Sequence, residues 1–236
     1  MIENDDFINL FVIKKNSFLV RCFSRFDHTC LYKNEIILED HQIDSKKNIF
    51  KYFLDDNIYK IEKNNNQFVR DIYLVVDDEK FLTINLCIKK NILGDLNFEK
   101  ESFNLVSKIK NEIKLNYKEF SIIHILIDNY LVDGVEFKFD KNLSSIYCKD
   151  FSIVITFVLM PSFSILDYQK VFADYQISIN KIVSGEYLKD YSLLEKANYF
   201  DAALKILLGN NPNEVIILSK KQENRGFFEK FFHLFS

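Results

Sequence analysis

The histidines and the acidic residues near them are the side chains of this chain that could bind a metal or move a proton. His28 and His41 flank an acidic stretch with Glu39 and Asp40, but their spacing matches no known metal-ligand pattern. His124 lies inside an apolar run, which is typical of a buried histidine with a hydrogen-bond partner. We therefore predict no metal site and no catalytic histidine.

The cysteines and the remaining acidic cluster give no stronger signal. The chain has no Cys-x-x-Cys pair and no Gly-x-Ser-x-Gly nucleophile elbow, and its four thiols are widely spaced. This predicts free thiols in a reducing compartment, at Cys22, Cys30, Cys87 and Cys148. The acidic residues 77–79 are interpreted as a solvated turn between two strands.

Phosphate binding usually requires clustered glycines, because a Cβ keeps backbone N–H groups away from a phosphate. The chain has five glycines, and no two of them are close in sequence. The turn of the first expected hairpin, residues 14–17, has none. We therefore predict that the chain binds no nucleotide, uses no cofactor and is not an enzyme.

The last segment carries the sharpest pattern. Five phenylalanines recur at helical spacing near the end of the chain, next to basic residues, which is typical of a helix at a membrane interface. The same stripe could instead pack on the protein's own core or in a groove of a partner. The membrane hypothesis assigns the contact to Lys220, Lys221, Arg225, Phe227, Phe228, Lys230, Phe231, Phe232, Leu234 and Phe235.

Composition limits the class of protein. The 236 residues are 48% hydrophobic, which indicates a folded core, and the formal net charge of −3 makes nucleic acid an unexpected partner. The N-terminal residues are acidic and the longest apolar run is too short to cross a bilayer. These features predict a cytoplasmic protein, or one bound peripherally to the inner face of the cell membrane.

Apolar periodicity predicts alternating strands and helices, and hence a mixed α/β or α+β fold. The expected strands are 7–13, 17–23, 30–38, 71–76, 81–89, 121–127, 146–160 and 177–183. The expected helices are 45–53, capped by Ser45, 99–117, 164–175, 193–208 and 224–236. Gly134 is expected to take a positive φ in a turn.

The order of these elements, together with several local strings, resembles the FtsA family of actin-like bacterial cell-division proteins. The clearest string is FSIIHILIDNYLVDG at 120–134, which is similar to a strand and turn of that family. NYFDAALKILLG at 198–209 is similar to the family's penultimate helix, and the last segment to its membrane-targeting helix. The chain departs from the family in its glycine-free first hairpin and in having no second, glycine-rich hairpin.

The resemblance implies a reduced actin-like first lobe without the nucleotide-binding lobe. Residues 1–77 and 159–219 would form the core of that lobe, 78–158 an inserted strand-helix-strand subdomain, and 220–236 a spacer and the amphipathic helix. It implies a membrane-associated scaffold or adapter that tethers division proteins, with FtsZ-like polymers or other division proteins as partners, and possible self-association. Two alternatives stay open: an actin-like ATPase remnant that binds nucleotide, and an unrelated soluble α/β interaction domain.

Overall fold

The computed structural model describes residues 6–77, 79, 81–138 and 146–215, and within them it shows a mixed α/β fold with two sheets and five α-helices. The first sheet, sheet A, has the order β3-β2-β1-β4-β9. Its strands are β1 (Phe7–Lys14), β2 (Ser17–Ser24), β3 (Cys30–Ile37), β4 (Asp71–Asp77) and β9 (Ser178–Ser184). The β1–β2 and β2–β3 pairs are antiparallel, whereas β1, β4 and β9 run parallel.

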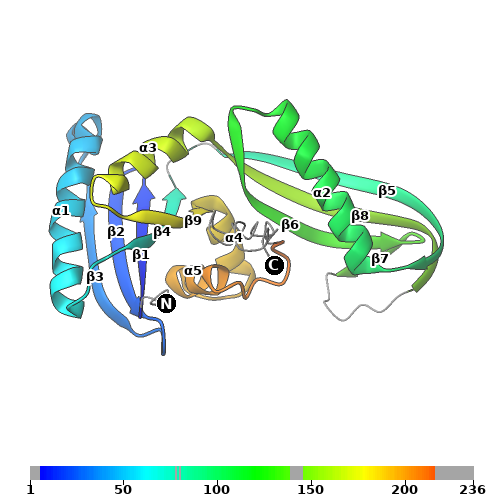
Figure 1. Ribbon diagram of the computed structural model, residues 1–236, viewed down its shortest axis with the longest axis horizontal. Coiled ribbons are helices and arrows are strands. Elements are labelled where there is room, and N and C mark those ends of the chain that lie inside the picture. The colour runs from blue at the N-terminus through cyan, green and yellow to red at the C-terminus, as the bar shows by residue number, and fades with distance from the viewer. Residues whose placement is uncertain (1–5, 78, 80, 139–145, 216–236) are drawn as a thin grey trace, which may run out of the picture.

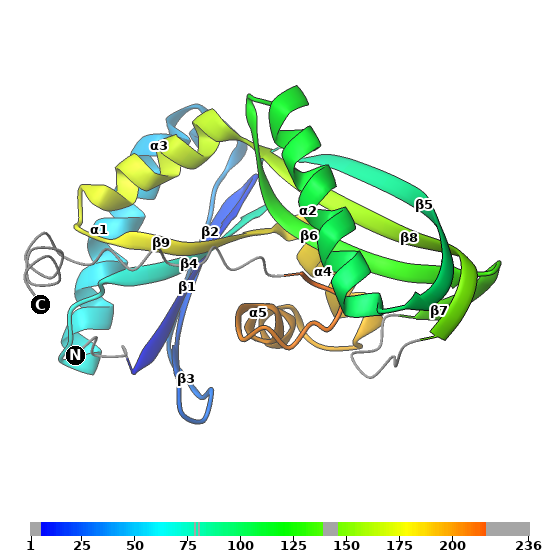
Figure 2. The ribbon, with the colours of Figure 1, turned by 45° about the vertical axis from the view of Figure 1, so that its right-hand side comes forward.

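Helices cover both faces of the centre of sheet A, which explains why residues 8–13 of β1 are all buried, including the polar Asn9. The helices α1 (Lys46–Asn65) and α3 (Ser162–Ala173) pack on one face, where Phe11, Phe18, Phe50 and Phe172 form an aromatic cluster. The helices α4 (Gly185–Leu194) and α5 (Tyr199–Leu207) pack on the other face. Figure 2 shows this three-layer arrangement, with α1 and α3 on one side of the strands and α5 on the other.

The second sheet, sheet B, is inserted between β4 and α3 and is antiparallel throughout, with the order β5-β8-β6-β7. Its strands are β5 (Leu82–Leu96), β6 (Phe120–Val132), β7 (Val135–Lys138) and β8 (Ile146–Pro161). The helix α2 (Phe98–Asn116) packs along one face, as Figure 1 shows. Strand β5 alternates between half-buried and exposed residues, as expected for a sheet with one covered face.

The architecture is consistent with the reduced actin-like lobe that the resemblance implies. The turn at Gly134 has the expected positive φ, of 81°. The subdomain boundaries at 77/78 and 158/159 stay a prediction. The expected helix 224–236 and all the proposed membrane-binding residues lie outside the described part of the chain.

The structure corrects two helix predictions. The expected helix 193–208 is wrong: α4 ends at Leu194, and α5 starts anew after Asn198, whose side chain accepts hydrogen bonds from the amides of Phe200 and Asp201. Lys196 between them has a φ of 50°, which cannot continue a helix. The first helix continues to Asn65, well beyond residue 53, and Ser45 makes no side-chain cap.

Candidate functional site

The carboxyl ends of parallel strands are where open α/β sheets usually bind ligands. In sheet A these ends are Lys14 of β1, Asp77 of β4 and Ser184 of β9, which parallel pairing brings to one edge. Helix α4 begins directly after β9, so its N-terminus faces the same edge. This edge is the first candidate site.

The protein's own carboxylate occupies this edge. Asp77 forms an ion pair with Lys189 of α4, with an O–N distance of 2.8 Å, and its side chain is only 14% exposed. Gly185 lies so close that a Cβ on it would be 2.4 Å from the Cβ of Asp77. A helix N-terminus attracts anions, and here Asp77 takes the place that an anionic ligand would need. The prediction that residue 77 lies in a solvated turn is therefore wrong, because strand β4 carries it into this contact.

The hairpin between β1 and β2 is bound to the rest of the lobe. The carbonyl of Asn16 accepts a hydrogen bond of 2.7 Å from the amide of Leu38. The Lys46 ammonium donates to the carbonyl of Lys14 at 2.8 Å. The turn has no glycine, so Cβ atoms keep its backbone N–H groups from closing on a phosphate, and it is poorly suited to cradle one.

A buried polar junction joins the two sheets. His124 of β6 is 1% exposed, and its Nδ1 lies 2.8 Å from a carboxylate oxygen of Glu214. The amide of Ser184 donates to His124 Nε2 at 3.1 Å, so the ring is neutral and donates its Nδ1–H to Glu214. Lys181 also contacts Glu214, at 2.9 Å. The prediction of a buried, hydrogen-bonded histidine is confirmed.

The electrostatics of this junction follow from burial and pairing. Burial lowers the pKa of His124, against the opposing effect of its hydrogen bond to Glu214. Burial raises the pKa of Glu214, but the hydrogen bond from His124 and the charge of Lys181 outweigh it and lower that pKa overall. Burial next to Glu214 raises the pKa of Tyr187, whose hydroxyl accepts a hydrogen bond from Asn211.

The junction holds the segment after α5 against sheet B. The amide of Ile127 donates to the carbonyl of Asn213, and the amide of Val215 donates to the carbonyl of Ile125, both at 2.9 Å. Sequence reasoning missed Glu214, because it lies 90 residues from His124 and no local pattern marks it. The polar groups of the junction bond to one another, so we assign it a structural role.

The second candidate site is the outer edge of sheet B. Strand β5 spans 15 residues and pairs with β8 on one side, and no described strand pairs with its other side. A shift in register between Asn91 and Gly94 interrupts it, and Leu93 there has a φ of 52°. The regular stretch Leu82–Lys90 therefore presents unpaired backbone groups, which is the geometry needed for addition of another strand.

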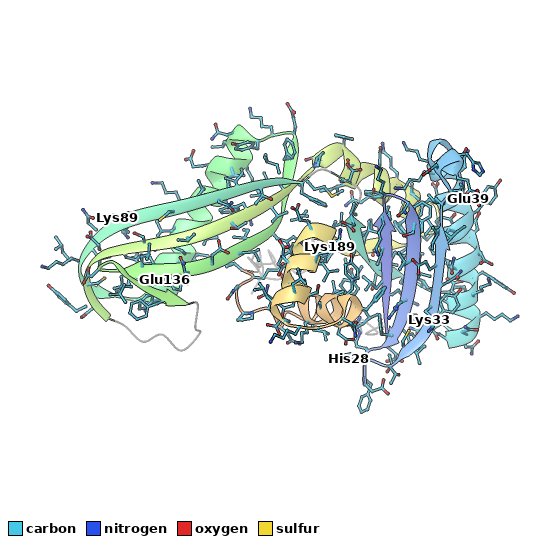
Figure 3. The ribbon with its side chains drawn as sticks, turned by 180° about the vertical axis from the view of Figure 1, so that it is seen from behind. His28, Lys33, Glu39, Lys89, Glu136 and Lys189 are labelled. Atoms are coloured by element: carbon cyan, nitrogen blue, oxygen red, sulfur yellow. The ribbon has the colours of Figure 1, made fainter. Side chains whose placement is uncertain are left out.

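The two candidate sites lie far apart in the molecule, as the labelled lysines show. In Figure 3, Lys189 lies on α4 near the middle of the molecule, while Lys89 lies on the distant end of sheet B. Lys89 pairs with Asp150 at 2.9 Å, and Lys90 pairs with Glu101 of α2. Lysines of this kind limit the promiscuous pairing of an edge strand.

The remaining sequence predictions concern metal binding, membrane-spanning helices and the cysteines. His41 contacts Glu39 at 3.3 Å, with both side chains about three-quarters exposed. Within the described ranges, no group of three or more metal-ligating side chains could hold a metal ion. None of the helices in that same part of the chain is both long and apolar enough to cross a membrane. The cysteines are free thiols, buried at positions 22 and 148 and exposed at 30 and 87.

Comparisons with known proteins give weak likenesses. No protein-family model matches the chain, and no curated protein matches it significantly. A structure of the PilM–PilN type IV pilus biogenesis complex is similar at 7% identity and a TM-score of 0.45, covering 79% of this chain and 49% of that one. The cytoplasmic domain of EpsL, an inner membrane component of the type II secretion system of Vibrio cholerae, is similar at 7% identity and a TM-score of 0.33, covering 76% and 57%.

The chain thus spans about half the length of these two solved structures. Both TM-scores are below 0.5, so neither likeness determines the family or the function of the chain.

Proposed function

We propose that this protein is a non-enzymatic adapter that binds the inner face of the cell membrane through its terminal aromatic stripe and a protein partner through strand β5. The unpartnered edge of β5 is the observation that carries the proposal. Backbone groups on an edge strand supply affinity for any extended segment, and the alternating side chains supply selectivity. In the more specific form, the adapter tethers bacterial division proteins such as FtsZ-like polymers, as the resemblance implies.

The state of the first candidate site supports an adapter over an enzyme. At the carboxyl ends of the parallel strands of sheet A, Asp77 and Lys189 form a mutual ion pair, and Asp77 lies so close to Gly185 that a Cβ would not fit there. A substrate at this position would need an accessible polar group to meet, and both charged groups here are already paired. The ATPase-remnant alternative requires this edge to open, and no contact described here favours that.

Two native thiols allow a matched test of the β5 edge. Cys87 lies on β5 and Cys30 lies on β3, one of the two edge strands of sheet A, and both are exposed. We would prepare Cys30→Ser, which keeps the thiol on β5, and Cys87→Ser, which keeps the thiol on β3. Each variant would be labelled with a thiol-reactive photocrosslinker and illuminated with the membrane fraction.

We expect the label at Cys87 to give discrete cross-linked species, whose masses distinguish a second copy of this chain from another protein. The label at Cys30 is the control and is expected to give none of these species. Equal cross-linking from both positions, or none from Cys87, would contradict a partner at the β5 edge. Membrane binding is tested separately, by sedimentation with liposomes.

A further inference from the structure

A cavity of about 430 Å³ opens between α1, α3 and the β1–β2 hairpin, on the face of sheet A opposite the junction with Glu214. Its volume lies within the range of small-molecule sites, which is about 300–1,000 Å³. Neither candidate site described above uses it. No sequence pattern predicts this cavity, because its walls come from four separate parts of the chain.

The floor of the cavity is apolar. Ile13, Phe18 and Phe50 line it, and each is at most 6% exposed. Phe163, the second residue of α3, also lines the cavity and is 67% exposed. An apolar group entering the cavity would therefore meet aromatic and aliphatic surface below it and an aromatic ring beside it.

One buried polar atom in the wall has no partner. Ser164 is 3% exposed, lines the cavity, and its hydroxyl forms no hydrogen bond with any described residue. A buried hydroxyl without a partner costs free energy, so such a group needs an explanation. The hydroxyl of Ser162 differs, because it pairs with Ser121 at 2.8 Å.

Ser164 lies in the first turn of α3, where the backbone amides also lack a side-chain cap. The residue at the N-cap position is Pro161, which makes no capping hydrogen bond. The amide of Ser162 already donates to the carbonyl of Glu119 at 2.8 Å, but the positive end of the helix dipole still favours an anionic oxygen at this position. The Ser164 hydroxyl can donate a further hydrogen bond to the same oxygen.

The rim carries charges of both signs on separate elements. Lys46 and Lys47 come from α1, Asp167 comes from α3, and Glu79 comes from the connection between β4 and β5. The four charges sum to zero. A simple anion would meet two carboxylates here and a simple cation would meet two lysines, whereas a ligand with both charges can satisfy both sets.

We infer that this cavity binds a small zwitterion with an apolar body, which is the chemistry of an apolar α-amino acid. The carboxylate binds at the Ser164 hydroxyl, the first turn of α3 and the lysines of α1. The ammonium group binds at Glu79 and Asp167, and the apolar side chain lies on Phe18 and Phe50. This site is independent of the β5 edge and of the terminal stripe.

The test is a ligand series measured by calorimetry and by thermal unfolding of the full chain. L-phenylalanine and L-leucine carry all three features, 3-phenylpropanoate lacks the ammonium group, phenethylamine lacks the carboxylate, and glycine lacks the apolar body. We expect saturable binding for at least one of the two complete ligands. Each incomplete ligand should bind at least about tenfold more weakly, the effect of losing one charged hydrogen bond or the apolar contact.

Substitutions in the cavity lining test whether the amino acid binds there. Ser164→Ala should leave the melting temperature of the ligand-free protein unchanged or higher, because it removes an unpartnered hydroxyl, and should weaken amino-acid binding about tenfold. Lys47→Gln should weaken it as well, while Lys51→Gln, one turn further along α1, should not. If neither L-phenylalanine nor L-leucine binds, the inference is wrong. It is equally overturned if the incomplete ligands bind as tightly, or if Ser164→Ala and Lys47→Gln leave binding unchanged.

Discussion

Sheets A and B differ in how much of their faces and edges the rest of the protein covers. The central strands β1 and β4 of sheet A are buried on both faces between two pairs of helices, and the carboxyl ends of its parallel strands are closed by Asp77, Gly185 and Lys189. Sheet B is covered on one face by α2 and leaves the edge of β5 unpaired. The comparison supports the proposal that sheet B, rather than sheet A, presents the surface for a partner.

The largest expected effect comes from adding one methyl group to each sheet. In Gly185→Ala the new Cβ would overlap Asp77 at 2.4 Å, whereas in Gly94→Ala on β5 it would meet no atom within 4 Å. We expect Gly185→Ala to lower the free energy of unfolding by about 1–3 kcal/mol. Gly94→Ala should change it by less than about 1 kcal/mol. Urea unfolding followed by circular dichroism measures both, and equal stabilities would mean that the edge of sheet A is not tightly closed.

The second prediction concerns acid and the junction between the sheets. The folded protein holds His124 neutral with a lowered pKa, so below pH 6.5 the unfolded chain binds a proton that the folded protein does not. Stability should therefore fall as the pH drops below 6.5, with a slope of at most about 1.4 kcal/mol per pH unit from this group. Below pH 4.5, Glu214 adds to the loss, because its folded pKa is also lowered.

The control for this pH dependence is an exposed histidine. His124→Asn should flatten the dependence of the urea midpoint between pH 6.5 and 5, whereas His41→Asn, on the surface, should leave it as in the original protein. An unchanged slope in His124→Asn would show that the junction does not couple protonation to the packing of sheet B against sheet A.

The smallest expected effect on stability comes from the ion pair between Asp77 and Lys189, at the N-terminus of α4. Because the Lys189 side chain is 56% exposed, its ion pair with Asp77 contributes at most about 1 kcal/mol. Asp77→Ala should therefore cost little stability but should leave the N-terminus of α4 open to phosphate. Phosphate should then raise the melting temperature of Asp77→Ala more than that of the original protein or of Asp190→Ala. A magnesium nucleotide that binds the original protein at micromolar affinity would contradict the closed edge.

Sequence patterns predicted the alternating order of elements because buried strands and amphipathic helices leave a periodic trace. They failed between residues 193 and 208, where the cap at Asn198 was read as part of one apolar helix. Its side chain and the acidic residue Asp201 in the first turn were the available signal.

The sites were less predictable than the elements. Glu214 meets His124 across 90 residues, and the cavity at Ser164 depends on how α1 and α3 sit on one sheet. Such contacts depend on tertiary packing and leave no local pattern. An inserted antiparallel sheet must end in edge strands, so the presence of an unpaired edge could be predicted from the sequence. Which strand forms that edge could not be predicted.

The most direct test of the adapter proposal is liposome sedimentation of the full chain beside Phe228→Asp/Phe232→Asp, with a chain ending at Lys221 as a reference. One helix should bind anionic vesicles weakly and reversibly, because partial burial of each ring contributes only about 1 kcal/mol, and salt should reduce the part due to the lysines and the arginine. We predict that the double variant and the shortened chain stay in the supernatant while melting at the same temperature as the original protein. Sedimentation of all three alike, or a melting temperature many degrees lower for the double variant, would contradict the proposed membrane contact.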